Sequence, residues 1–289
     1  MIFVLSLKDK RTRQLNLFAL EPAPGKHFHL RFKLVMMKEP KTIFVSLAGV
    51  GGCSVSKALR SLGQNALPFD WLIARQDFII SAVESDGQSF FDFSNPERLH
   101  GQTIITMPDN SALSIHDFKK NWALEKEDVQ KKYQRRWMRF HDILNSRQTT
   151  QAPRKIIFVR SFLDMDEPIE SIYDDIFVRR EENIQLWEDF IRRLQKKNPD
   201  IVMDILIVTS RKDVKSDMPN VHVVTLKNYK DYKEIRKAIK KLMPVADRLS
   251  YSAVNFKFAL KKFYRKNISR FFRKSTAGTN GSGRSSHPS

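Results

Sequence analysis

Short apolar segments rich in β-branched residues alternate along this chain with longer segments of helical periodicity. The segments KTIFVSLA, KIIFVRSF, MDILIVTS and VHVVTL occupy residues 41–48, 155–162, 203–210 and 221–226. Apolar residues recur at helical spacing in 54–62, 121–147, 180–198 and 230–243, and a further helix is expected at 75–84. Buried strands that alternate with helices are typical of folds with a parallel sheet covered on both faces. The alternation therefore predicts an α/β fold, a three-layer sandwich with a mostly parallel sheet.

Composition shifts divide the chain into four parts. Hydrophobic residues make up 41% of the chain and include 21 Phe, so residues 41–245 can form one catalytic-type α/β domain with a sizeable core. Residues 1–40 are a basic leader or N-terminal extension. We expect a basic amphipathic helix at 250–274 and a disordered Ser/Gly-rich tail at 275–289.

The cysteine and targeting signals indicate a compartment. One Cys in 289 residues excludes an internal disulfide and fits a reducing environment. No apolar run is long enough for a transmembrane helix, and the N-terminus lacks the charge order of a secretory signal. We therefore expect an intracellular protein, cytoplasmic or peripheral to a membrane.

The formal net charge of +19 is concentrated near the C-terminal end. Residues 227–274 contain 16 Lys or Arg and three acidic residues. Within 255–274, Phe and other apolar residues occupy one helical face and basic residues the other, a pattern suited to an anionic membrane surface. The same segment also suits nucleic-acid phosphates, or a helix that docks its apolar face on the domain. All three interpretations stay open.

The only cysteine, Cys53, stands where the first strand meets the first helix, after the glycines of GVGG. A helix N-terminus stabilises a thiolate, and backbone N–H groups after Gly52 can stabilise an oxyanion. The same glycine turn, residues 49–53, also suits plain phosphate binding. A small buried cysteine without a chemical role is the third interpretation.

A nucleophilic cysteine needs a histidine as its base. Among seven His residues, His116 in SIHDF is the first candidate, because a short apolar stretch ends there beside an acid; His100 is the second. The spacing of His and Cys matches no zinc pattern, so neither a metal nor a cofactor is expected.

The order of several motifs resembles a known family. The motifs are SLAGVGGCSVSKALRSLG, ALPFDW, SIHDF, KKYQRRWMRF and KIIFVRSF. They are similar to the "putative papain-like cysteine peptidase" family, whose members carry a strand–SLG-x-N-C–helix element, a PFDW box and a later HDF. The resemblance covers roughly residues 41 to 210, and the PFDW box and the Cys-then-His order are its most specific parts. It implies a papain-like α+β fold as the alternative architecture.

The resemblance also assigns roles to residues. It implies that Cys53 is the nucleophile and His116 the base, and it matches Asp70 and Trp71 to the PFDW box. Asp70 either orients the imidazole or caps local structure, and the side chain of Asp117 is expected to point away from the imidazole. Gly52 stands where the family has a polar residue, so a side-chain oxyanion donor is missing.

Three functions follow. The first is a cysteine peptidase or related Cys/His acyl-transfer hydrolase acting on a peptide or other acyl compound. The second is a Rossmann-like transferase or a phosphate- or nucleotide-sugar-binding protein that uses the 49–53 turn. Arg135, Arg136, Arg139 or Arg160 would then supply positive charge. The third is a non-catalytic module held to a membrane or nucleic acid through 255–274.

Overall fold

The computed structural model describes residues 42–49, 52–88, 90, 96–99, 102–118, 122–145, 155–162, 176–178, 180–228, 231–244 and 247. All of them belong to the compact unit Glu39–Ser289, which is distinct from Met1–Lys38. The expected leader at 1–40, the basic helix at 250–274 and the tail at 275–289 lie outside the described residues.

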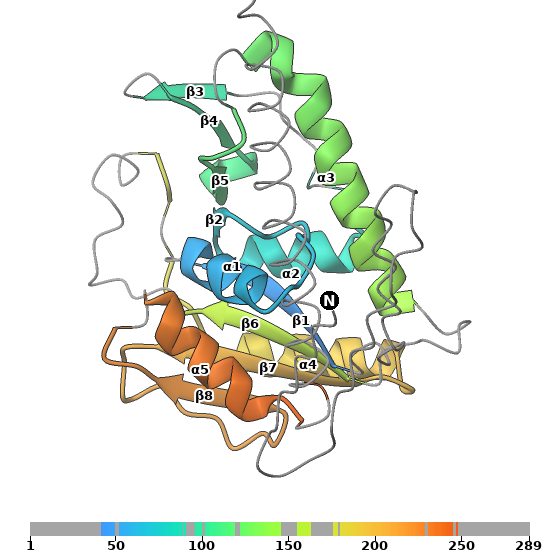
Figure 1. The fold of residues 1–289 in the computed structure, drawn as a ribbon, viewed down its shortest axis with the longest axis vertical. Helices are drawn as coiled ribbons and strands as arrows, with labels where there is room; N and C mark the ends of the chain where they lie inside the picture. Colours follow the sequence, from blue (N-terminus) through green and yellow to red (C-terminus); the bar gives the residue numbers. More distant parts are fainter. Residues whose placement is uncertain are drawn as a thin grey trace, which may run out of the picture. The chain divides into compact units, whose positions relative to one another are not determined.

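A four-stranded parallel sheet is the centre of this unit (Figure 1). Its order is β1 (Thr42–Gly49), β6 (Lys155–Ser161), β7 (Val202–Thr209) and β8 (Val221–Thr225), and each neighbouring pair is parallel. Strands β6 and β7 read as nearly continuous apolar runs because both of their faces are covered by helices.

The two faces of the sheet carry different helices. Ile157 and Val159 of β6 pack with α1 (Gly52–Ser61) and α5 (Tyr232–Leu242). Ile156 and Phe158 point the other way and pack with α4 (Ile184–Lys197), as expected from the alternation of side chains along a strand. This arrangement confirms the predicted α/β class and its mostly parallel sheet. It is also consistent with the papain-like α+β alternative.

A second, antiparallel sheet completes the fold. Its order is β2 (Leu72–Ala74), β5 (Ala112–Ser114), β4 (Gln102–Thr106) and β3 (Pro96–Leu99), with a short 3-10 helix at Pro108–Asn110. From the sequence, GQTIITM at 101–107 is expected to form a strand and the polar residues 85–101 a loop. Strand β4 agrees with the first expectation, whereas β3 shows that the second is wrong for Pro96–Leu99. The PERL segment has no alternating apolar pattern, so its strand conformation comes from pairing with β4.

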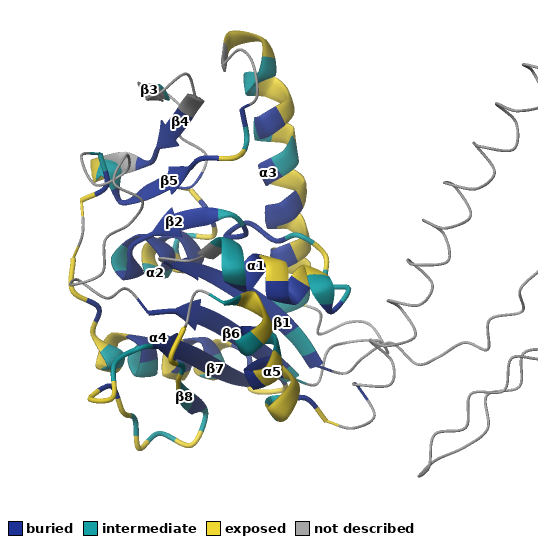
Figure 2. Cartoon of the chain, turned by 60° about the vertical axis from the view of Figure 1, so that its left-hand side comes forward, coloured by how far each residue is buried: buried dark blue, intermediate teal, exposed yellow. Residues whose placement is uncertain are grey.

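Aromatic residues join the long helix α3 (Trp122–Asn145) to the loop between α1 and β2. The ring of Phe69 meets those of Phe90, Trp137 and Phe140 edge to face, with centroids 5.5, 6.0 and 5.9 Å apart. All four side chains are buried. Buried positions recur along α3 (Figure 2). Helix α2 (Gln76–Glu84) packs in the same core through Phe78 and Ile79. The Pro68–Trp71 segment therefore has a rigid backing.

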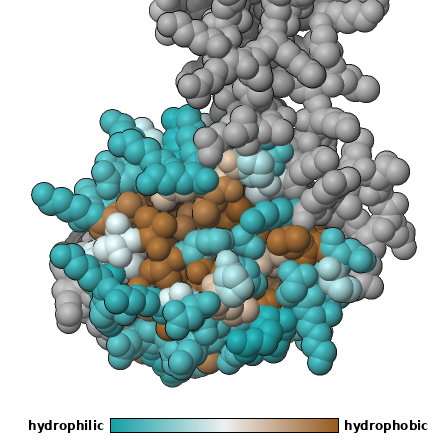
Figure 3. All heavy atoms as spheres, turned by 90° about the horizontal axis from the view of Figure 1, so that it is seen from below, coloured by the Kyte–Doolittle hydropathy of each residue, from teal (hydrophilic) through white to brown (hydrophobic). Residues whose placement is uncertain are grey.

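The face seen from below Figure 1 carries a hydrophobic area surrounded by hydrophilic side chains (Figure 3). The edge strand β8 lies on this side, and its Val223 and Val224 are half-buried. Among the helices that the structure describes, none combines the length and the apolar character that a membrane span requires.

Candidate functional site

The carboxyl end of β1 is shaped to start a helix. The pairing of β1 with β6 shifts register between Ser46 and Gly49, and Ala48 and Gly49 have φ values of 57° and 119°. A Cβ on Gly49 would overlap the carbonyl oxygen of Ser161, so only glycine fits there. Helix α1 begins at Gly52, two residues earlier than the apolar spacing predicted. Cys53 therefore lies in the first turn of the helix, beyond the carboxyl end of a parallel strand, where α/β folds bind ligands.

Cys53 and His116 come together from different sheets. Sγ of Cys53 lies 3.2 Å from Nε2 of His116, which lies two residues after the end of β5 at Ser114. Cys53 is half-exposed and His116 is exposed, so a molecule from solvent can reach both side chains. The structure thus brings together the two residues that the sequence analysis ranked first. His100, the second candidate base, lies outside the described residues.

Trp71 packs against the imidazole. Its ring meets that of His116 at 84°, with the centroids 6.1 Å apart. The backbone of Trp71 has φ of 71°, an unusual value for a bulky residue, and its N–H donates a 3.1 Å hydrogen bond to Oγ of Ser56. The loop thus holds the indole ring against the imidazole.

Asp70 stabilises the loop rather than the imidazole. One carboxylate oxygen accepts from Oγ of Ser56 at 2.9 Å, and the other accepts from the N–H of Leu67 at 2.9 Å. Burial raises the pKa of Asp70 above its usual value, although these hydrogen bonds and the charges of Arg136 and Arg60 oppose the rise. No hydrogen bond joins Asp70 to His116 among the residues that the structure describes. Of the two roles considered, the contacts fit the capping of local structure.

Asp117 anchors the segment that carries His116. Its carboxylate accepts hydrogen bonds from Ser114 in β5 and from Lys132 and Tyr133 in α3. Burial acts to raise the pKa of Asp117, but these hydrogen bonds and the charge of Lys132 outweigh it and hold the pKa below its usual value. The side chain is therefore directed toward Lys132 and Tyr133 of α3.

The anchoring partners were not among the predicted site residues. Lys132 and Tyr133 lie within KKYQRRWMRF, in which only the arginines were candidates. The tyrosine is fully buried, and its pKa is raised well above 10 by burial and by the nearby charge of Asp117. A tyrosine inside a basic helical run gives no local signal that it bonds to a turn about 16 residues earlier.

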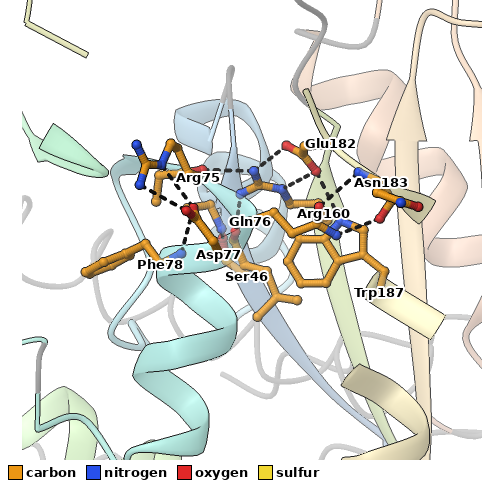
Figure 4. Close-up of polar contacts among 12 residues, drawn as sticks. Ser46, Arg75, Gln76, Asp77, Phe78, Arg160, Glu182, Asn183 and Trp187 are labelled. Carbon is orange, nitrogen blue, oxygen red and sulfur yellow. Dashed lines mark hydrogen bonds and ion pairs between the residues drawn. The ribbon is translucent and has the colours of Figure 1, made fainter. Parts of the chain in front are cut away.

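Arg160 lies in a separate polar network (Figure 4). Its side chain is fully buried and donates to the carbonyl oxygens of Leu47 and Ala74 at 2.7 and 2.8 Å. It also forms an ion pair with Glu182 and stacks over the ring of Trp187 at 5.4 Å. Its role is therefore to join β1, β2 and the start of α4. The suggestion that Arg160 supplies charge to an anion is not supported, since these partners already occupy its donors.

The other supporting candidates take different places. Gly52 is the first residue of α1. Arg136 is buried and lies over the ring of Tyr133 at 5.2 Å, within electrostatic reach of Asp70. Among the described residues, no group of three or more His, Cys, Asp or Glu side chains is arranged to hold a metal ion.

Comparison with known proteins identified one family. A family model described as "Putative papain-like cysteine peptidase" matches residues 42–213, more than half of the chain. The match includes Cys53, the PFDW box and the HDF segment, and it ends after β7. Searches of curated proteins and of solved structures gave no match.

Proposed function

Because this chain belongs to the "putative papain-like cysteine peptidase" family, we propose that it is a cysteine peptidase or a related acyl-transfer hydrolase. Cys53 is its nucleophile and His116 its general base. The observation that carries the proposal is the 3.2 Å distance between Sγ of Cys53 and Nε2 of His116. This distance is within hydrogen-bond reach for sulfur, which is the geometric requirement for a histidine that activates a thiol.

The position of Cys53 favours the reactive thiolate. The amino-terminal end of a helix carries the positive pole of the macrodipole, which stabilises a negative charge in the first turn. A neighbouring imidazolium adds to this effect, and together they lower thiol pKa values from about 8.5 into a range of roughly 3.5 to 7.5. Both features meet at Cys53, in the first turn of α1 beside His116.

The proposed reaction has two halves. The Cys53 thiolate attacks the carbonyl carbon of the substrate, and the tetrahedral intermediate collapses to a thioester as His116 gives a proton to the leaving amine or alcohol. Water then attacks the thioester while His116 accepts a proton from it, and the acid and the free thiol are released. The positive end of α1 stabilises the oxyanion in both halves.

The site works as a pair supported by neighbours. Trp71 packs against the imidazole, and Asp117 holds the backbone turn that carries it. Both are positioning residues, because they act through His116. In the described part of the chain no carboxylate bonds to Nδ1 of His116, which favours a dyad over a triad.

The two alternatives lack a comparable observation. Gly49 is explained by its close approach to Ser161, so its presence does not require a phosphate. The membrane or nucleic-acid role of 255–274 falls outside the described residues.

Trapping of the acyl-enzyme tests the proposal. Wild type treated with p-nitrophenyl acetate should show a burst of nitrophenol, and mass spectrometry should find one acetyl group on Cys53. His116→Ala should retain the fold and acylate at least tenfold more slowly. Equal acylation rates for wild type and His116→Ala would contradict the proposal, because they would show an ordinary exposed thiol.

A further inference from the structure

Four arginines gather where α1 ends and α3 passes. Arg135 and Arg136 are adjacent on α3, Arg139 lies one helical turn further along, and Arg60 lies in the last turn of α1. Burial and repulsion from Arg136, Arg135 and Arg60 lower the pKa of Arg139. The charge of Arg139 therefore interacts with that of each of the other three arginines. We call them the arginine cluster.

The arginine cluster lacks the carboxylate partners that other arginines have. Arg180, Arg192, Arg193 and Arg211 each form an ion pair with Asp or Glu. Within the described ranges, no Asp or Glu forms an ion pair with any member of the cluster. Asp70 is within electrostatic reach, but its two oxygens accept from Ser56 and Leu67. The cluster thus has the charge of Asp70 nearby but no carboxylate in a direct ion pair with any of its members.

Arg136 supplies a second, independent observation. Only 8% of its surface is exposed, and its buried Nη1 has no hydrogen-bond partner among the described residues. Burial of a donor without a hydrogen-bond partner is unfavourable, and more so when the donor is charged. The guanidinium lies over the ring of Tyr133 at 5.2 Å. A guanidinium with an unpaired N–H can recognise a planar oxyanion in the bidentate manner.

We propose that the arginine cluster binds a carboxylate or phosphate group, with Arg136 as the buried anchor and Arg60, Arg135 and Arg139 around it. Arg135 and Arg139 are exposed, so they form the entrance. Because the anchor is buried, the site selects a compact anionic group rather than the extended backbone of a nucleic acid. The site does not depend on the chemistry proposed for Cys53.

Calorimetric titration at low ionic strength tests this site, with inorganic phosphate and succinate as the two probes. Wild type should bind one equivalent of at least one probe in a saturable manner. The probe that binds more tightly identifies the group as a phosphate or a carboxylate. Arg135→Gln/Arg139→Gln, which alters exposed side chains, should weaken that binding at least tenfold. Lys237→Gln/Lys240→Gln removes the same number of charges from exposed positions on α5 and should leave it within twofold.

Two further variants sharpen the result. Arg136→Lys keeps the charge but not the planar fork, and it should lose binding while retaining a cooperative thermal transition. Cys53→Ser should bind like wild type, which separates this site from the proposed nucleophile. The proposal is overturned if neither probe saturates wild type, or if the α3 and α5 double variants lose binding equally.

Discussion

Cys53 and His116 are 63 residues apart in sequence, yet their Sγ and Nε2 atoms lie 3.2 Å apart. The cysteine is placed by a helix that follows the parallel sheet, and the histidine by a strand of the antiparallel sheet. The pair therefore forms only when both sheets are in place. Residues far from the pair are expected to affect its reactivity through the orientation of these two elements.

Removal of the anchor of His116 should slow the acylation of Cys53 without unfolding the protein. In Asp117→Asn the hydrogen bonds from Lys132 and Tyr133 weaken, so the turn that carries the imidazole loses its fixed position. We expect the rate of Cys53 acylation to fall about tenfold or more, with the circular dichroism spectrum unchanged. Asp189→Asn, which removes an exposed carboxylate paired on α4, should acylate like wild type.

Asp117 should also make stability depend on pH at the acid end. Its folded-state pKa is held below the usual value of 3.8, so its contribution is complete above the unfolded-state pKa and is lost as the pH falls through the folded one. Urea unfolding of wild type and Asp117→Asn should therefore show a difference in free energy that is constant from pH 7 to 5. The difference should shrink below pH 4. A difference in unfolding free energy that grows toward low pH would contradict a lowered pKa of Asp117 in the folded protein.

Asp70 is expected to affect the stability of the fold and not the reactivity of the Cys53 thiol. Asp70→Ala leaves the N–H of Leu67 and the hydroxyl of Ser56 without their acceptor in a buried place, which should cost about 1–3 kcal/mol of unfolding free energy. The pH dependence of Cys53 alkylation should be unchanged in the folded variant. A shift in that profile would mean that Asp70 acts on the imidazole after all.

Gly49 should not tolerate a side chain. Gly49→Ala combines a positive φ with overlap between the new Cβ and the carbonyl oxygen of Ser161, so we expect a loss of about 1–3 kcal/mol or more in denaturant unfolding. Gly63→Ala provides the comparison, because Gly63 has φ of 85° and follows α1. Equal losses at the two positions would show that φ alone matters and that the approach to Ser161 does not.

The fold could be predicted from the sequence where apolar runs are long. Strands β1, β6, β7 and β8 are buried on two faces or form strongly β-branched runs, so their composition marks them. Strands β2 and β5 have three residues each, and β3 is polar, so pairing rather than periodicity defines them. The antiparallel sheet that positions His116 was therefore only partly visible.

The candidate site, like the fold, could be predicted from the sequence only in part. The junction before α1 indicated Cys53, and the short apolar stretch that ends beside an acid in SIHDF indicated His116, because both signals are local. Adjacent residues in one motif nevertheless took different roles, since Asp70 bonds within its loop and Trp71 contacts His116. Arg160 was a candidate from its charge alone, but its partners Leu47, Ala74 and Glu182 lie in three distant segments. Sequence spacing does not report such tertiary contacts.

The pH dependence of iodoacetamide alkylation tests the central claim most directly. The chain has one Cys, so every modification reports on Cys53. Wild type should show an alkylation rate with an apparent thiol pKa well below the ordinary value of about 8.5. In His116→Ala that apparent pKa should rise toward the ordinary value. A wild-type thiol that titrates near 8.5, with the same profile in His116→Ala, would contradict the pairing of Cys53 with His116 as nucleophile and base.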